Sequence, residues 1–128
     1  MVMTNAYELS RQLIAEWGYK VVEDNGEHMA IKYQMNTIHV YLNNDDTNFM
    51  TMILPGFADV NEENFSDVIM NCHKLNEQLK QVKFYTINDC IIVACEFYFL
   101  AKTDLAFQMK TALSNLIAAK VNYRKLVN

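Results

Sequence analysis

Glycine, proline and cysteine are scarce in this sequence of 128 residues. Its three glycines lie far apart, so the chain has no glycine-rich loop that could cradle a phosphate group. Its three cysteines show no metal-ligand spacing, and their odd number favours a reducing compartment over a framework of disulfides. Cys72, Cys90 and Cys95 stand among apolar residues, where we expect small buried side chains. The sequence therefore predicts no cofactor and no metal site.

Clusters of basic residues and long apolar runs are also missing. The 11 basic residues against 15 acidic ones give a net charge of −4, which argues against binding to a nucleic-acid backbone. The N-terminus lacks a basic region followed by an apolar run, so we expect no signal peptide. The most apolar run, residues 90–101, contains Glu96 and is too short to cross a bilayer. We therefore expect a soluble, cytoplasmic protein that binds neither nucleic acid nor membrane.

The composition, with 52% apolar and 20% charged residues, is that of a globular protein. A chain of 128 residues is long enough to bury a core, and the sequence has no linker, low-complexity segment or internal repeat. We therefore expect residues 1–128 to form a single domain.

The stretch from Leu75 to Leu100 contains the clearest hairpin of the sequence. Residues 82–87 alternate with period two, as in a strand with one buried face. Asn88-Asp89 tolerates the positive φ of a tight turn. The strand that follows is apolar on both faces, so we expect it to lie inside a sheet with other elements covering it.

This turn gives the hairpin two different faces. Its register places Phe84 opposite Val93 and Val82 opposite Cys95. One face has no charge, and we expect it to face the core: Val82, Phe84, Ile91, Val93, Cys95, Phe97 and Phe99. The other face is mixed: Lys83, Tyr85, Ile92, Ala94, Glu96, Tyr98 and Leu100. The mixture suits an interface, and it equally suits an ordinary strand, in which tyrosine and β-branched residues are common.

Two further turn signals lie in the first half of the chain. Asn25-Gly26 predicts a type I′ turn between strands 19–24 and 28–34. Met35-Asn36 predicts a second turn, before strand 37–43. The expected pairs across these turns are Glu23 with His28, Val22 with Met29, Tyr33 with Ile38, Ile31 with Val40 and Lys32 with His39.

A polar loop and a fourth strand follow. Asn43–Asp46 carries carboxylates, but it lacks the full ligand set and the terminal glutamate of a calcium loop, so we expect a solvated turn. Residues 49–54 form a strand that is rich in methionine and apolar on both faces. Pro55-Gly56 is expected to end it.

Three helices complete the predicted order. The first spans residues 6–17, capped by Asn5 and ended by Gly18. The second is capped by Asn61, ends near Lys80 and buries Phe65, Val68, Ile69, Cys72, Leu75 and Leu79. The third is capped by Thr103 and buries Ala106, Met109, Leu113, Leu116 and Ile117.

No arrangement of residues commits the chain to a chemistry. No serine sits in a nucleophile elbow, and Cys72 and His73 are adjacent on a helix, so they point in different directions. His28 has a partner in Glu23 across the first hairpin, and His39 belongs to the polar face of its strand. We predict no catalytic residue, and an enzyme is the least favoured function.

The order of elements and the turn positions resemble those of the YbjN-type family of bacterial sensory transduction regulators, whose fold is shared by type III secretion chaperones. The resemblance covers about residues 5–116. It is carried by the Leu75-Asn76 pair that ends the second helix, by the 82–85 strand with its Asn88-Asp89 turn and the 91–93 strand, and by the first hairpin. It implies an α+β fold, an antiparallel sheet with three helices in the order α-β-β-β-β-α-β-β-α, dimers, and binding to other proteins.

We therefore predict a non-catalytic protein-binding or regulatory module, a homodimer of bacterial origin that captures another protein or an extended peptide. The alternatives are, in order, a small-ligand sensory domain with a pocket between sheet and helices, a dedicated secretion chaperone, and an enzyme. If a helix covers the mixed face, its residues are core instead. The candidate binding face consists of Tyr41, Met50, Met52, Tyr85, Ile92 and Tyr98.

Overall fold

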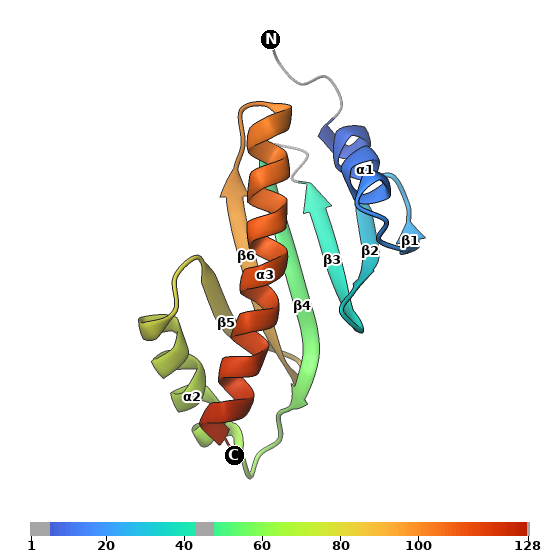
Figure 1. The fold of residues 1–128 in the computed structure, drawn as a ribbon. Coiled ribbons are helices and arrows are strands. Elements are labelled where there is room, and N and C mark those ends of the chain that lie inside the picture. The colour runs from blue at the N-terminus through green and yellow to red at the C-terminus, as the bar shows by residue number, and fades with distance from the viewer. Residues whose placement is uncertain (1–5, 43–47, 128) are drawn as a thin grey trace.

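The computed structural model describes residues 6–42 and 48–127, and within them it has the predicted order of helices and strands (Figure 1). The predicted cap Asn5 and the Asn43–Asp46 loop lie outside these residues. The elements are α1 (Ala6–Glu16), β1 (Val21–Asp24), β2 (His28–Tyr33), β3 (Asn36–Leu42), β4 (Phe49–Asp59), α2 (Phe65–Gln78), β5 (Val82–Ile87), β6 (Cys90–Tyr98) and α3 (Lys102–Val127).

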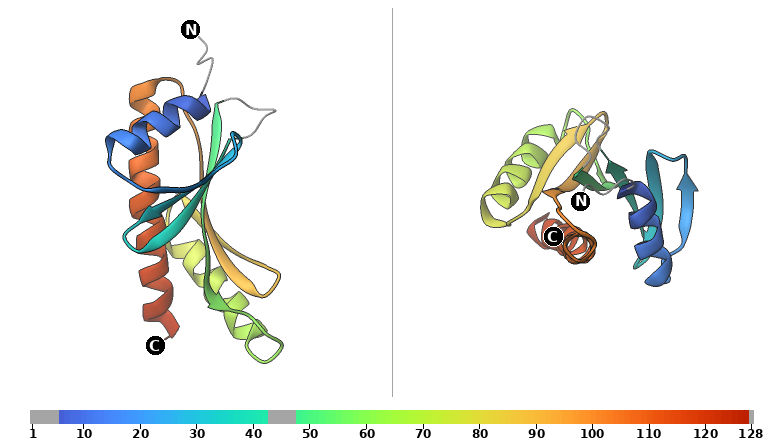
Figure 2. Two further views of the ribbon diagram at one scale, coloured as in Figure 1. Left: turned by 90° about the vertical axis from the view of Figure 1, so that its right-hand side faces the viewer. Right: turned by 90° about the horizontal axis from the view of Figure 1, so that it is seen from above.

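The described strands form one antiparallel sheet in the order β1-β2-β3-β4-β6-β5. The long helix α3 lies along β6 and β4, α2 lies against β5, and α1 lies over the β1–β2 end (Figures 1 and 2). Helices α1 and α3 cover one side of the twisted sheet, and α2 lies beside the edge strand β5. One continuous apolar core joins the three helices to the sheet. The chain is therefore α+β, as the sequence predicts.

The β5–β6 hairpin has the predicted register, with Phe84 opposite Val93 and Val82 opposite Cys95. Asn88 adopts a positive φ of 54° in the turn. The seven residues of the predicted core face are all buried. The register of this hairpin could be predicted because the turn residues and the alternation of both strands indicate the same pairing.

The predicted register of the first hairpin is wrong, since Asp24 lies opposite Met29 and Glu23 opposite Ala30. The turn is centred on Gly26 and Glu27 rather than on Asn25-Gly26, and Gly26 has φ +90°. The cause lies in the Asn25 side chain, whose Oδ1 accepts the backbone N–H groups of Glu27 and His28 at 3.0 and 2.8 Å. With these side-chain hydrogen bonds in place, Asn25 pairs with His28, and its N–H donates to the His28 carbonyl oxygen at 3.1 Å.

The second turn is also displaced by one residue, because Gln34 and Met35 hold the positive φ values, 49° and 66°. Tyr33 pairs with Asn36 and Ile31 with Ile38, so His39 lies opposite Ala30 and not opposite Lys32. The Asn36 side chain stabilises this turn, because its Nδ2 donates a hydrogen bond to the Gln34 carbonyl oxygen at 2.8 Å. Each partner shifts by two residues, which keeps every side chain on its predicted face.

Strand β4 does not end at Pro55-Gly56, as predicted, but continues to Asp59. Pro55 lies opposite Ile92, and the pairing with β6 is then irregular until Asp59 pairs with Cys90. Gly56 has φ +70° within this irregular segment. A bulge accommodates both residues, because the proline has no N–H to donate and the glycine accepts positive φ.

Two predicted helix starts are misplaced. Helix α2 begins at Phe65 rather than after Asn61, because the Asn61 Oδ1 accepts the N–H groups of Glu63 and Asn64 and forms a separate turn. Phe65 and Ile69 are consequently exposed, whereas Val68, Cys72 and Leu75 are buried as predicted.

Helix α3 begins at Lys102, so Thr103 lies inside its first turn instead of capping it. The Asp104 carboxylate accepts the Leu100 N–H at 2.8 Å in the manner of a capping residue. Helix α1 ends as predicted, with Gly18 at φ +79° and the Tyr19 N–H donating to the Ile14 carbonyl at 3.2 Å.

Candidate functional site

The face of the sheet that points away from the helices is the candidate site, and we call it the open face (Figure 2). No helix of the described ranges packs on it, so the prediction that these residues are core under a helix does not apply. Strand alternation assigns to it Glu23 of β1, His28, Ala30 and Lys32 of β2, Thr37, His39 and Tyr41 of β3, Phe49, Thr51, Ile53 and Pro55 of β4, Lys83, Tyr85 and Ile87 of β5, and Ile92, Ala94, Glu96 and Tyr98 of β6.

Four of the six predicted binding residues lie on the open face. Tyr98 is 64% exposed and Tyr41 is 41% exposed. Tyr85 is half-buried on the edge strand β5. Ile92 lies on the same face but only 7% of it is accessible. The structure thus brings these side chains onto one face, and Tyr98, Tyr41 and Tyr85 offer most of their accessible surface.

Met50 and Met52 do not belong to this face. They lie opposite Phe97 and Cys95 on the covered side of the sheet, and both are completely buried. Residues 49–54 are apolar at every position but one, so their sequence does not decide which alternate set faces inward. Pairing with β6 decides it, and it places Phe49, Thr51 and Ile53 outward instead.

A polar bridge crosses the centre of the open face. Lys83 Nζ lies 2.5 Å from Glu96 Oε1, and the Thr51 hydroxyl donates to Glu96 Oε2 at 3.2 Å. The hydrogen bond to Glu96 raises the pKa of Lys83. Ala94 lies opposite both Lys83 and Ile53 and is almost inaccessible. The centre of the face is therefore low and polar, between two aromatic ends.

One aromatic end is formed by Phe49 and Tyr98, which lie opposite each other on β4 and β6. Their ring centroids are 4.8 Å apart, with the planes tilted by 57°. Leu100, which follows β6, is also highly exposed. Exposed aromatic rings of this kind are typical of protein-binding surfaces.

The other end is formed by Tyr41 and two histidines. The rings of Tyr41 and His28 stack, with centroids 4.5 Å apart and planes 24° apart. His28 Nε2 and His39 Nδ1 lie 2.7 Å apart. Glu23 Oε1 lies 3.8 Å from His28 Nδ1, which confirms the predicted partner in spite of the wrong register. The contact between the histidines was missed, because the predicted register put Lys32 opposite His39.

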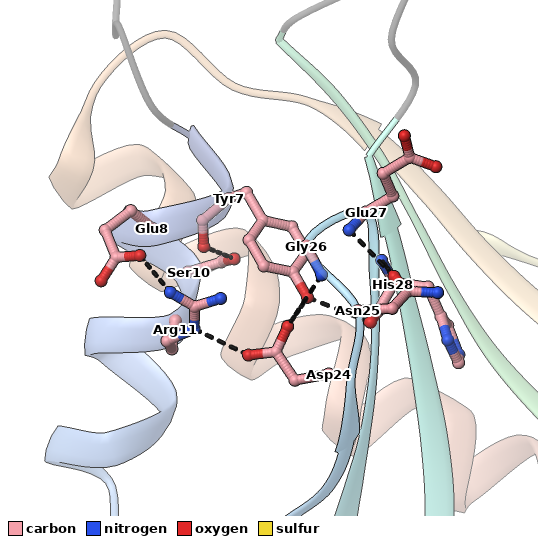
Figure 3. Close-up of polar contacts among 9 residues, drawn as sticks. All are labelled: Tyr7, Glu8, Ser10, Arg11, Asp24, Asn25, Gly26, Glu27 and His28. Carbon is pink, nitrogen blue, oxygen red and sulfur yellow. Dashed lines mark hydrogen bonds and ion pairs between the residues drawn. The ribbon is translucent and has the colours of Figure 1, made fainter.

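A cluster on α1 fixes the hairpin that carries His28 (Figure 3). The Tyr7 hydroxyl lies within hydrogen-bond distance of the Asp24 carboxylate and, at 3.0 Å, of the His28 carbonyl oxygen. Arg11 Nε donates to Asp24 Oδ2 at 2.7 Å. The Arg11 hydrogen bond, with that of Tyr7, lowers the pKa of Asp24 to about 2, while burial and Asp24 raise the pKa of Tyr7 to about 12. We call the contacts of Tyr7 and Arg11 with Asp24 the clasp, and we infer that they hold the hairpin that carries His28 in place against α1.

Two of the three cysteines, Cys72 and Cys95, are buried, and Cys90 is partly exposed. Burial raises the pKa of the Cys95 thiol to about 11 and also raises that of Cys72, so both stay protonated. No group of three or more His, Cys, Asp or Glu side chains in residues 6–42 and 48–127 is placed to hold a metal ion. Within the same ranges, no helix combines the length and hydrophobicity needed to cross a membrane.

Three solved structures show the similarity of fold. YbjN of E. coli, a proposed transcription regulator, shares 11% identity at a TM-score of 0.73, over 92% of this chain and 90% of its own. The Yersinia pestis type III secretion chaperone SycH, crystallised with a fragment of YscM2, shares 15% identity at a TM-score of 0.61, over 91% of this chain and 97% of its own. An uncharacterised protein from Methanothermobacter thermautotrophicus shares 15% identity at a TM-score of 0.64, over 94% of each chain.

No protein-family model matches the sequence, and no curated protein matches it either. At these identities the likeness establishes the fold: the chain has the YbjN-type, secretion-chaperone-like architecture that the sequence predicts.

Proposed function

We propose that this chain is a non-catalytic protein-binding module that captures another polypeptide through the open face. The observation that carries the proposal is the position of Tyr41 and Tyr98, two large exposed side chains on a face that the helices leave uncovered. Tyrosine offers a large contact area and a hydroxyl at low entropic cost, which suits recognition of a polypeptide. That a chaperone of the same fold, SycH, was crystallised with a protein fragment supports this proposal.

The form of binding that we propose follows from the β5 edge of the sheet. Asn76 of α2 hydrogen-bonds the outer backbone groups of Phe84, so the β5 edge is closed at its middle to an added strand. We therefore propose that the partner lies across the open face and contacts side chains, with the Lys83–Glu96 bridge giving it a polar centre to match.

We further propose that the protein is a single cytoplasmic domain and that it forms a homodimer through the same face. A second copy supplies the same aromatic ends and the same polar centre, which a two-fold axis would bring together. Self-association then competes with capture of another protein, and both depend on the same tyrosines.

The test is a double variant, Tyr85→Glu with Tyr98→Glu, compared with the wild type in tagged capture from a native lysate and in sedimentation. The matched control is Phe107→Glu with Val121→Glu, two exposed apolar positions of α3 on the helical side. We expect the tyrosine variant to lose both self-association and its specific partner, while the control keeps them.

Unchanged self-association and unchanged capture in the tyrosine variant would reject the open face. Circular dichroism must first show that the variant is folded. If the double variant is unfolded, the single variant Tyr98→Glu is tested in the same two assays. The Tyr98 side chain is mostly exposed, so its exchange leaves the core intact.

A small-ligand sensory domain remains the alternative proposal. A hollow of about 710 Å³ lies between α2 and the end of α3, lined among others by Asp59, Asp67, Lys74 and Tyr123. Its lining combines residues of the two helices with Ala58 and Asp59 at the end of β4. A metabolite that raises the melting temperature, and whose effect is lost in Lys74→Ala, would favour this function over polypeptide capture.

A further inference from the structure

The two histidines on the open face lie edge to edge. His28 Nε2 and His39 Nδ1 are 2.7 Å apart, and the ring planes differ by only 9°. The ring centroids are 5.0 Å apart. This exceeds the distance between the two nitrogens by about two ring radii, as expected when both nitrogens lie on the line that joins the ring centres. The rings therefore lie almost in one plane, with the two in-plane nitrogens pointing at each other, which is the geometry of an N–H···N hydrogen bond.

This geometry suits a proton between the rings and not a metal ion. Metal–imidazole bonds are about 2.0–2.1 Å long, so an ion on the line between the nitrogens needs a separation of about 4 Å. The observed separation is 2.7 Å. The described residues also provide no third ligand.

The pair tolerates one positive charge but not two. With one imidazole neutral, one nitrogen donates and the other accepts. With both protonated, two N–H groups face each other and the bond must break. Glu23 Oε1 lies 3.8 Å from the other ring nitrogen of His28, Nδ1. His39 is half-buried, and its burial, followed by the charge of His28, lowers its pKa from the ordinary 6.5, against an opposing effect of Glu23.

Among residues 6–42 and 48–127, few other charged groups lie near the pair. Tyr41 stacks on His28 from β3, and β4 contributes Thr51 and Ile53. Lys32 lies farther along β2, on the same face. From the helical side, Tyr7 reaches only the backbone of His28, while Asp24 is held by Arg11. Nearby Glu96 is bound to Lys83.

We propose that Glu23, His28 and His39 form a proton-operated latch that holds Tyr41 in its binding position and releases it when both imidazoles are protonated. This regulation rests on the proposed function of the open face. At neutral pH the rings are joined and His28 supports the Tyr41 ring. In mild acid the rings repel each other, the stack is lost, and partner binding weakens.

The first test follows the stability of the chain alone. Urea unfolding is measured from pH 7.5 to 5.8, above the isoelectric point of about 5.3. Because the pKa of His39 is lowered by folding, the unfolded chain binds more protons in this range, and stability falls as pH falls below the ordinary value of 6.5. His39→Asn keeps a hydrogen-bonding group at the Nδ1 position and cannot titrate, so we expect it to flatten this slope.

His73→Gln is the control, because His73 is an exposed histidine on α2 beside Glu77 and should leave the slope unchanged. In imidazole ¹⁵N spectra, His28→Gln should move the titration of His39 to higher pH, since the neighbouring charge is removed. Equal slopes in the wild type and His39→Asn, or an unshifted His39 titration in His28→Gln, overturn the latch.

The second test measures binding of the captured partner, or self-association, at pH 7.5 and 5.8. We expect the wild type to bind about fivefold or more weakly at the lower pH, and His39→Asn to lose that difference. A wild-type affinity that is equal at both pH values overturns the regulation. A chain that binds nothing at either pH contradicts the proposed function, and the stability slope then still decides whether the latch exists.

Discussion

The side chain of Asn76 on α2 pairs with both outer backbone groups of Phe84 on β5. The Phe84 N–H donates to Asn76 Oδ1 at 2.6 Å, and Asn76 Nδ2 donates to the Phe84 carbonyl at 3.0 Å. An amide side chain thus takes the place of a neighbouring strand at the edge of the sheet. This gives a physical reason for the Leu75-Asn76 pair: Leu75 enters the core, and Asn76 closes the edge.

We predict that Asn76→Ala lowers the free energy of unfolding by about 1–3 kcal/mol, because two hydrogen bonds to a partly buried backbone are lost. It should also increase aggregation, since the edge of β5 becomes available to other strands. Urea unfolding and light scattering measure the two effects. Gln78→Ala, an exposed site on the same helix, is the control, and an equal loss in both variants would show that the edge contact contributes nothing.

The placement of Met52 in the core gives a second prediction. Met52→Ala should cost about 2–5 kcal/mol of stability, as is usual for a fully buried methionine. Thr51→Ala, one residue away on the open face, removes one partly exposed hydrogen bond and should cost less than about 1.5 kcal/mol. Chemical denaturation distinguishes them. Similar losses in the two variants would contradict the assignment of faces in β4.

The sequence predicted the order of elements and the β5–β6 register correctly, because the Asn88-Asp89 turn and the alternation of both strands agree there. The two earlier hairpins were displaced by side-chain hydrogen bonds of Asn25 and Asn36, which local turn preferences do not include. In β2 and β3 the faces were still correct, because the displaced turn moves each partner by two residues and two is the period of a strand. In β1 the register shift between Val21 and Glu23 breaks this pattern, and Val22 is exposed.

The candidate site was predicted less completely than the fold. Tyr41, Tyr85 and Tyr98 alternate clearly with apolar neighbours, so their face could be assigned. The strand that holds Met50 and Met52 is apolar on both sides, and its inward face is set by pairing with a distant strand. The contact of His28 with His39 depends on the exact register, and so the latch was invisible until the structure placed them together.

The clasp between α1 and the first hairpin predicts a loss of stability in strong acid. The pKa of Asp24 is lowered to about 2 from an ordinary 3.8, so its contribution is complete above pH 3.8 and is lost as pH falls through about 2. Because the contact is largely exposed to solvent, we expect no more than about 1 kcal/mol. Asp24→Asn should therefore be less stable than the wild type at pH 5, and the difference should shrink towards pH 2.

Urea unfolding at pH 5, 3 and 2 measures this difference, and Tyr7→Phe separates the hydroxyl from the Arg11 ion pair. In Tyr7→Phe the Arg11–Asp24 contact remains, so most of the acid dependence should persist. A difference between Asp24→Asn and the wild type that does not vary with pH would show that Asp24 acts through packing instead of charge.

The three cysteines should differ in their reaction with a thiol reagent. Cys72 and Cys95 are buried, and burial raises the pKa of both thiols, whereas Cys90 is partly exposed beside the β5–β6 turn. We expect one equivalent to react within minutes at pH 7.5 in the native protein and the other two only as the chain unfolds, because the thiolate is the reactive form. Cys90→Ser should abolish the fast phase and leave the slow phase at the rate of unfolding. A fast phase that persists in Cys90→Ser would mean that the core between the sheet and the helices opens far more readily than its packing indicates.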